Sequence, residues 1–98
     1  MTTKLVALWT APDDVDGFDA DYLATHMVLV GTVPGLTGVV ASKAVDGPYF
    51  RMTELLSPDM GALGAALTSE QGLAVAADAE RLQQVFGNKL DVLIVEEQ

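Results

Sequence analysis

Two predicted strands of this chain are apolar on both sides, which restricts the folds that can bury them. One runs from Tyr49 to Leu56 and the other from Leu90 to Val95. A sheet with one face in water alternates apolar and polar residues along each strand, and these strands do not. We therefore expect both faces of their sheet to be covered, most simply by a second copy of the chain in a two-fold homodimer. A large exposed ligand groove is the alternative.

The order of the predicted elements indicates the fold class. Strands are predicted over Leu5–Trp9, Leu36–Val45, Tyr49–Leu56 and Leu90–Val95, and helices over Asp19 to about Val30, Ser57 to about Leu67 and Ser69 to about Phe86. Asp19 is the expected N-cap of the first helix, with Phe18 as its hydrophobic staple, and Ser57 is the expected cap of the short helix. The β-α-β-β-α-β order predicts an α+β, ferredoxin-like fold with a four-stranded antiparallel sheet, in one domain over residues 1–98.

The charge balance and the missing residue types exclude several kinds of function. The chain has 14 acidic and 5 basic residues and a net charge of −9, which argues against nucleic acid and anionic membranes as partners. It has no cysteine and one histidine, so a zinc site is not expected, and it has no Gly-rich phosphate loop and no nucleophile-elbow serine. No apolar run is long enough for a signal peptide or a membrane span, so we expect a cytoplasmic protein without metal or cofactor.

Two ionisable residues, His26 and Asp78, fall near the centre of apolar helical arcs. At about 100° per residue, the first helix lines up Leu29, Tyr22, His26, Val30, Leu23 and Met27, and the long helix lines up Ala74, Val85, Asp78, Leu82, Val75 and Phe86. A buried ionisable group costs free energy unless it is paired or put to use. We therefore expect any chemistry to lie at His26 and Asp78.

Four short motifs lie along nearly the whole chain. They are Tyr22-x-x-x-His26, Pro34-Gly35-Leu36 at the second strand, Pro48-Tyr49-Phe50-Arg51-Met52-Thr53-Glu54-Leu55 after the hairpin turn, and Ala66-Leu67-Thr68-Ser69-Glu70 leading to Asp78. As a set they resemble the EthD family, within the dimeric α+β barrel group. The resemblance implies a homodimer whose sheets pack into a barrel, with a small hydrophobic pocket in each protomer.

The resemblance implies a range of activities rather than one. The family takes its name from an association with ethyl tert-butyl ether degradation, in which its molecular role is not settled. Families on the same barrel include cofactor-free monooxygenases, polyketide cyclases, decarboxylases and muconolactone isomerases. A fold does not choose among these reactions, so the choice rests on the site.

His26, Tyr22 and Asp78 form the candidate catalytic set. An imidazole has an ordinary pKa near ~6.5 and can act as an acid or a base at neutral pH. Asp78 would orient His26 by accepting a hydrogen bond, and Tyr22, one turn earlier, would stabilise developing oxyanion charge. The alternative is structural: His26 and Asp78 pair with each other and hold their two helices over the sheet.

The candidate substrate-binding residues are Trp9, Tyr49, Arg51 and Met27. Aromatic and methionine side chains suit a flat or apolar ligand, and a guanidinium suits a carboxylate or an enolate. The alternative for the apolar residues is packing in a core or a dimer interface. For Arg51 the alternative is an ion pair with one of the many acids, such as Glu54.

Three classes of function fit these residues. The first is a cofactor-independent enzyme, such as an isomerase, cyclase, decarboxylase or monooxygenase, in which His26 moves a proton on a small hydrophobic carbonyl, aromatic or polyketide-like compound, with a link to ether or aromatic degradation. The second is a module that binds a small hydrophobic molecule without transforming it. The third is a dimer with a filled core that serves as an assembly partner.

Overall fold

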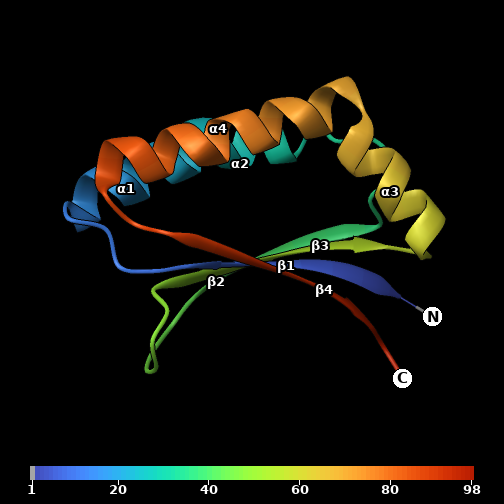
Figure 1. The fold of residues 1–98 in the computed structure, drawn as a ribbon, viewed down its shortest axis with the longest axis horizontal. Coiled ribbons are helices and arrows are strands. Elements are labelled where there is room, and N and C mark those ends of the chain that lie inside the picture. Colours follow the sequence, from blue (N-terminus) through green and yellow to red (C-terminus); the bar gives the residue numbers. More distant parts are fainter. Residues whose placement is uncertain (1) are drawn as a thin grey trace.

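The computed structural model describes residues 2–98 and places a layer of helices on one face of a sheet (Figure 1). The elements in chain order are β1 (Thr3–Trp9), α1 (Val15–Asp21), the π-helix η1 (Tyr22–His26), α2 (Met27–Val30), β2 (Gly38–Lys43), β3 (Arg51–Ser57), α3 (Met60–Thr68), α4 (Glu70–Phe86) and β4 (Leu90–Glu96). Neighbouring strands are antiparallel in the order β2-β3-β1-β4. The predicted α+β, ferredoxin-like fold is therefore confirmed.

The first helix begins earlier than the sequence suggested. Its N-cap is Asp14, whose carboxylate accepts a hydrogen bond from the backbone N–H of Gly17 at 3.0 Å. The prediction of Asp19 as the cap was wrong. Asp14 lies further upstream, and its carboxylate accepts the backbone N–H of the first helical turn. Phe18 is therefore a helical residue of the core rather than a staple before the helix.

The other helix ends confirm one predicted cap and correct another. The cap of α3 is Asp59, whose carboxylate accepts a backbone N–H at 2.8 Å, so the prediction of Ser57 was wrong. The Ser57 hydroxyl instead donates to the carbonyl of Thr3 at 3.1 Å, at the end of β3. Ser69 caps α4 as predicted, and Gly87 ends that helix with a left-handed φ of 65°.

A π-helical turn brings four residues of the first helix onto one face. Phe18, Tyr22, His26 and Val30 are all buried although each is four residues from the next. In an α-helix, each step of four overshoots a full turn by about 40°, which would spread these side chains around the helix. The π-helix η1 rotates less per residue and removes much of that drift. Leu23, expected in the apolar arc, is exposed, so that part of the prediction was wrong.

The strands are in the predicted order, but the hairpin is shorter at both strand ends. β2 ends at Lys43, so Val45 lies in the turn, where Gly47 has a φ of 103°. β3 begins at Arg51, so Tyr49 precedes the strand instead of opening it. The glycine and the residues beside it close the hairpin through a wider turn than the apolar pattern alone indicated.

An aromatic core holds the helical layer against the sheet near the ends of β1 and α4. Its buried members are Trp9, Phe18, Tyr22, Ala79 and Leu82. The rings of Phe18 and Tyr22 stack with centroids 5.6 Å apart, and Trp9 meets Phe18 edge-on at 5.5 Å. These rings fix the position of the first helix, and with it the side chains that follow Phe18 toward the middle of the sheet.

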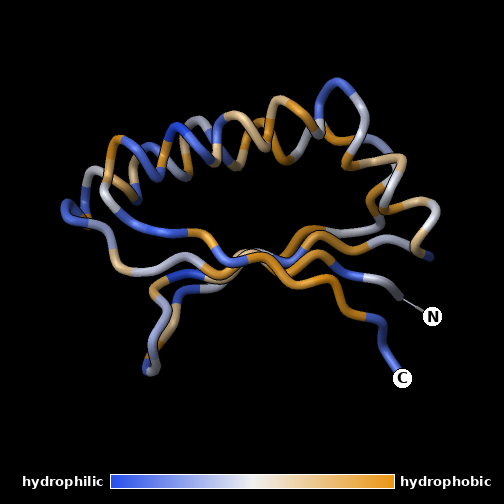
Figure 2. The backbone as a smooth tube through the Cα atoms, viewed as in Figure 1, coloured by the Kyte–Doolittle hydropathy of each residue, from blue (hydrophilic) through white to orange (hydrophobic). Residues whose placement is uncertain are grey.

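The outer face of the sheet, on the side away from the helices, carries exposed apolar residues. Among them are Val40, Leu93 and Val95, with 44%, 52% and 38% of their surface exposed. Figure 2 shows the apolar character of the strands where they cross the middle of the molecule. Within residues 2–98 no helix covers this face, so the predicted two-sided apolar sheet is present and its covering partner stays a prediction. Among the same residues, no helix is both long and apolar enough to cross a membrane.

Candidate functional site

A cavity of about 620 Å³ lies between the helical layer and the sheet. Helix α4 makes this space because it turns small residues, Gly72, Ala76 and Ala79, toward strands β1, β3 and β4. The cavity opens between α4 and β4, where Ala76 and Val92 are exposed. Its size and its mainly aliphatic wall suit a small organic ligand.

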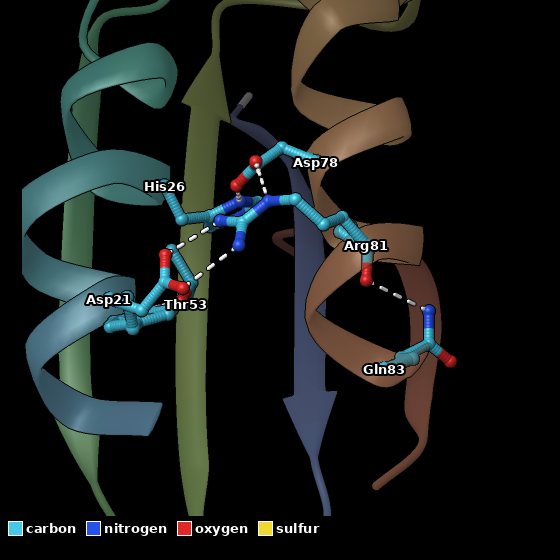
Figure 3. A network of polar contacts seen from close by, with 8 residues as sticks. Asp21, His26, Thr53, Asp78, Arg81 and Gln83 are labelled. Carbon is cyan, nitrogen blue, oxygen red and sulfur yellow. Dashed lines mark hydrogen bonds and ion pairs between the residues drawn. The ribbon is translucent and has the colours of Figure 1, made fainter. Parts of the chain in front are cut away.

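Two titratable residues of the described chain line this cavity, His26 and Glu80, and of the two His26 is the buried one. Its Nδ1 lies 2.9 Å from Oδ2 of Asp78 on the facing helix α4 (Figure 3). An ionised carboxylate can only accept hydrogen bonds, so the proton of a neutral imidazole is on Nδ1. Among residues 2–98 no group hydrogen-bonds to the other ring nitrogen, Nε2. The site therefore offers a free imidazole lone pair to an apolar cavity.

Arg81 extends the pair into a network between the two helices. Its Nε donates to Oδ1 of Asp78 at 2.7 Å. Its Nη1 and Nη2 donate to the two carboxylate oxygens of Asp21, at 2.8 and 2.6 Å (Figure 3). Such bidentate, charge-assisted contacts hold both partners in defined rotamers. The network thus connects α1 to α4 across the position of His26.

The surroundings lower the pKa values of His26, Asp78 and Asp21, although burial and hydrogen bonding act in opposite directions on each group. Burial lowers the pKa of His26, and the hydrogen bond to Asp78 only partly opposes that effect. Burial also disfavours the charged form of Asp78, but hydrogen bonds from Arg81 and His26 hold its pKa below the ordinary value. The hydrogen bond from Arg81 likewise lowers the pKa of Asp21. At neutral pH the pair is a neutral imidazole and a carboxylate.

Tyr22 supports His26 from outside the cavity. Its ring stacks on the imidazole with centroids 5.7 Å apart, and its hydroxyl is hydrogen-bonded to the hydroxyl of Thr53 within the core. Burial raises the pKa of this phenol. Tyr22 does not line the cavity, whereas Thr53 does. The tyrosine hydroxyl is therefore engaged away from the position where an oxyanion of a bound ligand would lie.

Of the four residues predicted to bind substrate, Trp9 lines the cavity. Its ring meets His26 edge-on with centroids 5.7 Å apart. The indole Nε1 is buried and has no hydrogen-bond partner among residues 2–98. Met27 packs against the aromatic core and does not line the cavity.

The other two predicted binding residues lie away from the cavity. Arg51 donates to Asp19 at 2.8 Å and stands over the Tyr22 ring. The suggested partner Glu54 instead pairs with Lys4, 3.4 Å away. Tyr49 donates its hydroxyl hydrogen to Asp91 at 2.9 Å. Arg51 is thus engaged in an ion pair and Tyr49 in a hydrogen bond at the surface, and neither side chain lines the cavity.

Several residues of the site were not predicted from the sequence. Arg81 follows Asp78 by three positions, a spacing that brings side chains together on one helix face, so this pair was readable. Its second partner, Asp21, is 60 positions away in the chain and gave no such signal. The small residues of α4 that leave the cavity open also did not indicate a cavity in the sequence, because alanine and glycine also occur in filled cores. Residues 2–98 contain no group of three or more His, Cys, Asp or Glu side chains placed to hold a metal ion.

Comparison with solved structures identifies proteins of the same architecture. A crystal structure of an ethyl tert-butyl ether (EthD) family protein from Bacillus halodurans C-125 is 30% identical, with both chains covered in full and a TM-score of 0.91. SnoaB, a cofactor-independent oxygenase from Streptomyces nogalater, is 13% identical over 99% of this chain and 93% of that chain, with a TM-score of 0.70.

A third similar structure is a dimeric protein of unknown function with a ferredoxin-like fold from Bacteroides fragilis. It is 9% identical over 98% of this chain and 96% of that chain, with a TM-score of 0.69. At such identities the last two similarities concern the fold alone. No family model and no curated protein matches this chain.

Proposed function

This chain belongs to the EthD family, and from that premise we propose that it is a cofactor-independent enzyme that moves a proton on a small hydrophobic compound. The observation that carries the proposal is the His26–Asp78 pair, joined at 2.9 Å through Nδ1, with Nε2 left free beside an apolar cavity. A neutral imidazole oriented by a carboxylate is a common arrangement for general-base catalysis. SnoaB, a cofactor-independent oxygenase of the same fold, gives further support for chemistry without a cofactor.

The proposed substrate is an uncharged carbonyl, aromatic or polyketide-like compound. The cavity wall is largely aliphatic, and no lysine or arginine lines it among residues 2–98. Glu80 stands at the wall, so an anionic ligand would meet repulsion rather than a counter-ion. The ring of Trp9 offers a surface for a flat molecule. The family's name, taken from ethyl tert-butyl ether, supports a role tied to the degradation of ethers.

The proposed step is removal of an acidic proton from the bound compound. Nε2 of His26 takes the proton from a carbon next to the carbonyl group, and the electron pair of the broken C–H bond delocalises onto the carbonyl oxygen as an enolate. Asp78 stabilises the imidazolium that forms, and the imidazolium balances the charge of the enolate. Return of the proton to a different carbon would complete an isomerisation. Alternatively, the enolate carbon would attack a second carbonyl carbon of the same molecule, whose π-electron pair moves to its oxygen and takes the proton from the imidazolium, which closes a ring.

A binding module is the second candidate, because one further observation favours it. Tyr22, the residue expected to stabilise an oxyanion, has its hydroxyl engaged with Thr53. Without that hydroxyl, the site could retain a ligand without stabilising the oxyanion that a transformation would need. The assembly partner with a filled core is disfavoured by the cavity of about 620 Å³.

Hydrogen–deuterium exchange into uncharged ketones separates the two candidates without knowledge of the physiological substrate. β-Tetralone, a bicyclic ketone fused to a benzene ring and carrying acidic benzylic α-protons, is incubated with the protein in D₂O and followed by NMR. The enzyme proposal predicts exchange above the buffer rate, and a loss of about 100-fold or more in His26→Asn. Tyr49→Phe, which changes an aromatic residue outside the cavity, is the control and should exchange like the wild type.

The outcomes of this assay have distinct meanings. Binding of the ketone without exchange, in a panel of such ketones, would overturn the enzyme proposal in favour of the binding module. Equal exchange by the wild type and His26→Asn would show that another group is the base. Exchange that requires His26 supports the proposed proton transfer.

We also propose that the outer sheet face is covered by a second copy of the chain. The exposed apolar residues of that face, such as Leu93 and Val95, support it, as does the dimeric Bacteroides fragilis protein of the same fold. Leu93→Glu should then convert a dimer to a monomer in analytical ultracentrifugation. Val28→Glu, which introduces the same charge at an exposed site on the helical layer, is the control. A monomeric wild type would contradict the proposal.

A further inference from the structure

Arg81 uses all three of its guanidinium nitrogens within the His26 network. Nε meets Oδ1 of Asp78 at 2.7 Å, while Nη1 and Nη2 meet the two oxygens of Asp21 at 2.8 and 2.6 Å. The second oxygen of Asp78 meets His26 at 2.9 Å. Each carboxylate oxygen of Asp78 therefore has one partner, Arg81 or His26, and the two contacts together hold the carboxylate in one orientation (Figure 3).

We propose that Arg81 is the positioning residue that keeps His26 available as a base. It fixes Asp78 in the rotamer that meets Nδ1, and it places a cation between the two carboxylates that flank the imidazole. The inference rests on the proposed function only in naming His26 as the base, because the effect on the imidazole itself exists with or without a substrate.

The charges around His26 explain why an arginine is needed there. Asp78 and Asp21 both favour the imidazolium, and Arg81 opposes it. Glu80 adds a further carboxylate at the cavity wall, while the rings packed on the imidazole, Tyr22 and Trp9, are uncharged. Without Arg81, a buried imidazole would face two unbalanced carboxylates and would hold a second proton more readily. A protonated Nε2 has no lone pair with which to accept a proton from a ligand.

A purely structural role for Arg81 makes a different prediction. As a clamp between α1 and α4, Arg81 would contribute stability and leave the titration of His26 unchanged. As the positioning residue, it would contribute stability and also hold the pKa of His26 down. The two roles are therefore separated by the protonation of the imidazole and not by the unfolding free energy.

The test is an NMR titration of the imidazole, which needs no residue assignment because His26 is the only histidine. We compare the wild type with Arg81→Gln and with the control Lys43→Gln, which removes the same charge from an exposed side chain on β2. The inference predicts that the titration midpoint of His26 rises in Arg81→Gln and stays at the wild-type value in Lys43→Gln. A folded Arg81→Gln with the wild-type midpoint would overturn it.

Arg81→Lys keeps the inference testable if Arg81→Gln does not fold. Lysine retains the charge but cannot donate to both carboxylates in the geometry of the fork. The midpoint should therefore lie above that of the wild type, and below that of Arg81→Gln where both are measured. An unchanged midpoint in Arg81→Lys, with Arg81→Gln unfolded, would contradict the positioning role. Since no ligand is present, this result is independent of whether the ketone assay finds exchange.

Discussion

Two arginine–aspartate clusters begin two residues apart on helix α1 and serve different ends. Asp19 reaches down to the sheet, where Arg51 lies 2.8 Å away and Lys43 lies 3.6 Å away. Asp21 reaches across to α4, where it meets Arg81. These are the two arginines of the chain, and each is held by an aspartate of the same helix.

The next contact of each arginine distinguishes the two clusters. Arg51 stands over the ring of Tyr22, 5.0 Å from its centroid, in a position that packs the first helix against β3. Arg81 continues to Asp78 and from there to His26 and the cavity. The same ion pair therefore fixes the fold in one place and prepares a proton acceptor in the other. An arginine–aspartate pair by itself does not reveal which of these roles it has. The next residue that the arginine contacts, Tyr22 or Asp78, distinguishes the two roles.

The largest expected effect is a difference between two aspartates, Asp78 in the Arg81 cluster and Asp19 in the Arg51 cluster. Asp78→Asn should lower the rate of ketone exchange by about 100-fold, because the imidazolium formed on His26 loses the carboxylate that stabilises it. Asp19→Asn removes a carboxylate from the other cluster and should leave the rate within a factor of about two, because the ion-pair partners of Asp19 among residues 2–98 are Arg51 and Lys43, outside the His26 network. The exchange assay in D₂O measures both, and equal losses would erase the distinction.

Loss of Arg51 should affect stability and not the imidazole. Arg51→Met removes a charge-assisted hydrogen bond to Asp19 and should cost about 1–3 kcal/mol in the free energy of unfolding. Urea denaturation measures this cost, and the NMR titration of His26 in the same variant should match the wild type. A raised midpoint in Arg51→Met would mean that the clusters are coupled.

The pH dependence of stability should show His26 directly. Its pKa in the folded state lies below the ordinary value of 6.5, so the unfolded chain binds more protons as the pH falls below that value. Stability should therefore decline as the pH falls from 6.5 toward the folded-state pKa, and His26→Asn should lose this part of the decline. Denaturation at a series of pH values tests it, and an identical profile in the variant would contradict a depressed pKa. The lowered pKa values of Asp78 and Asp21 act in a separate window, below 3.8.

The smallest expected effect concerns Lys43, at the exposed edge of the Arg51–Asp19 cluster. The side chain of Lys43 is 57% exposed and lies 3.6 Å from Asp19. Lys43→Gln should change the free energy of unfolding by less than about 0.5 kcal/mol, since exposed ion pairs contribute little. Thermal unfolding is sufficient to measure it, and a change above about 1 kcal/mol would place Lys43 among the structural residues of the cluster.

The sequence was sufficient for the fold because apolar spacing and turn residues act locally. The run Leu90–Val95, the Gly47 turn and the Ser69 cap each specify their own segment, and the order of segments then limits the topology. The errors lie at Asp19 and Ser57, where more than one polar residue was able to cap a helix. The π-turn at Tyr22–His26 had no signal in the local sequence pattern.

The candidate site was predictable in part for the same reason. His26 and Asp78 stood out because a charged residue in an apolar arc conflicts with its surroundings, and they do meet across two helices. Asp21 lies on a polar face, where an acidic residue is ordinary, so its pairing with Arg81 was visible only in the structure. The cavity itself arises from small residues that could equally have packed tightly.

The ¹⁵N chemical shifts of the single imidazole report directly whether His26 offers a base to the cavity. At pH 7 we expect one ring nitrogen with the shift of an N–H nitrogen and one with the shift of an unprotonated nitrogen, with the proton on Nδ1 and the lone pair on Nε2. Asp78→Asn, which removes the charged acceptor, should alter this pattern. Two protonated nitrogens at pH 7, or a proton on Nε2 alone, would mean that His26 offers no base to the cavity.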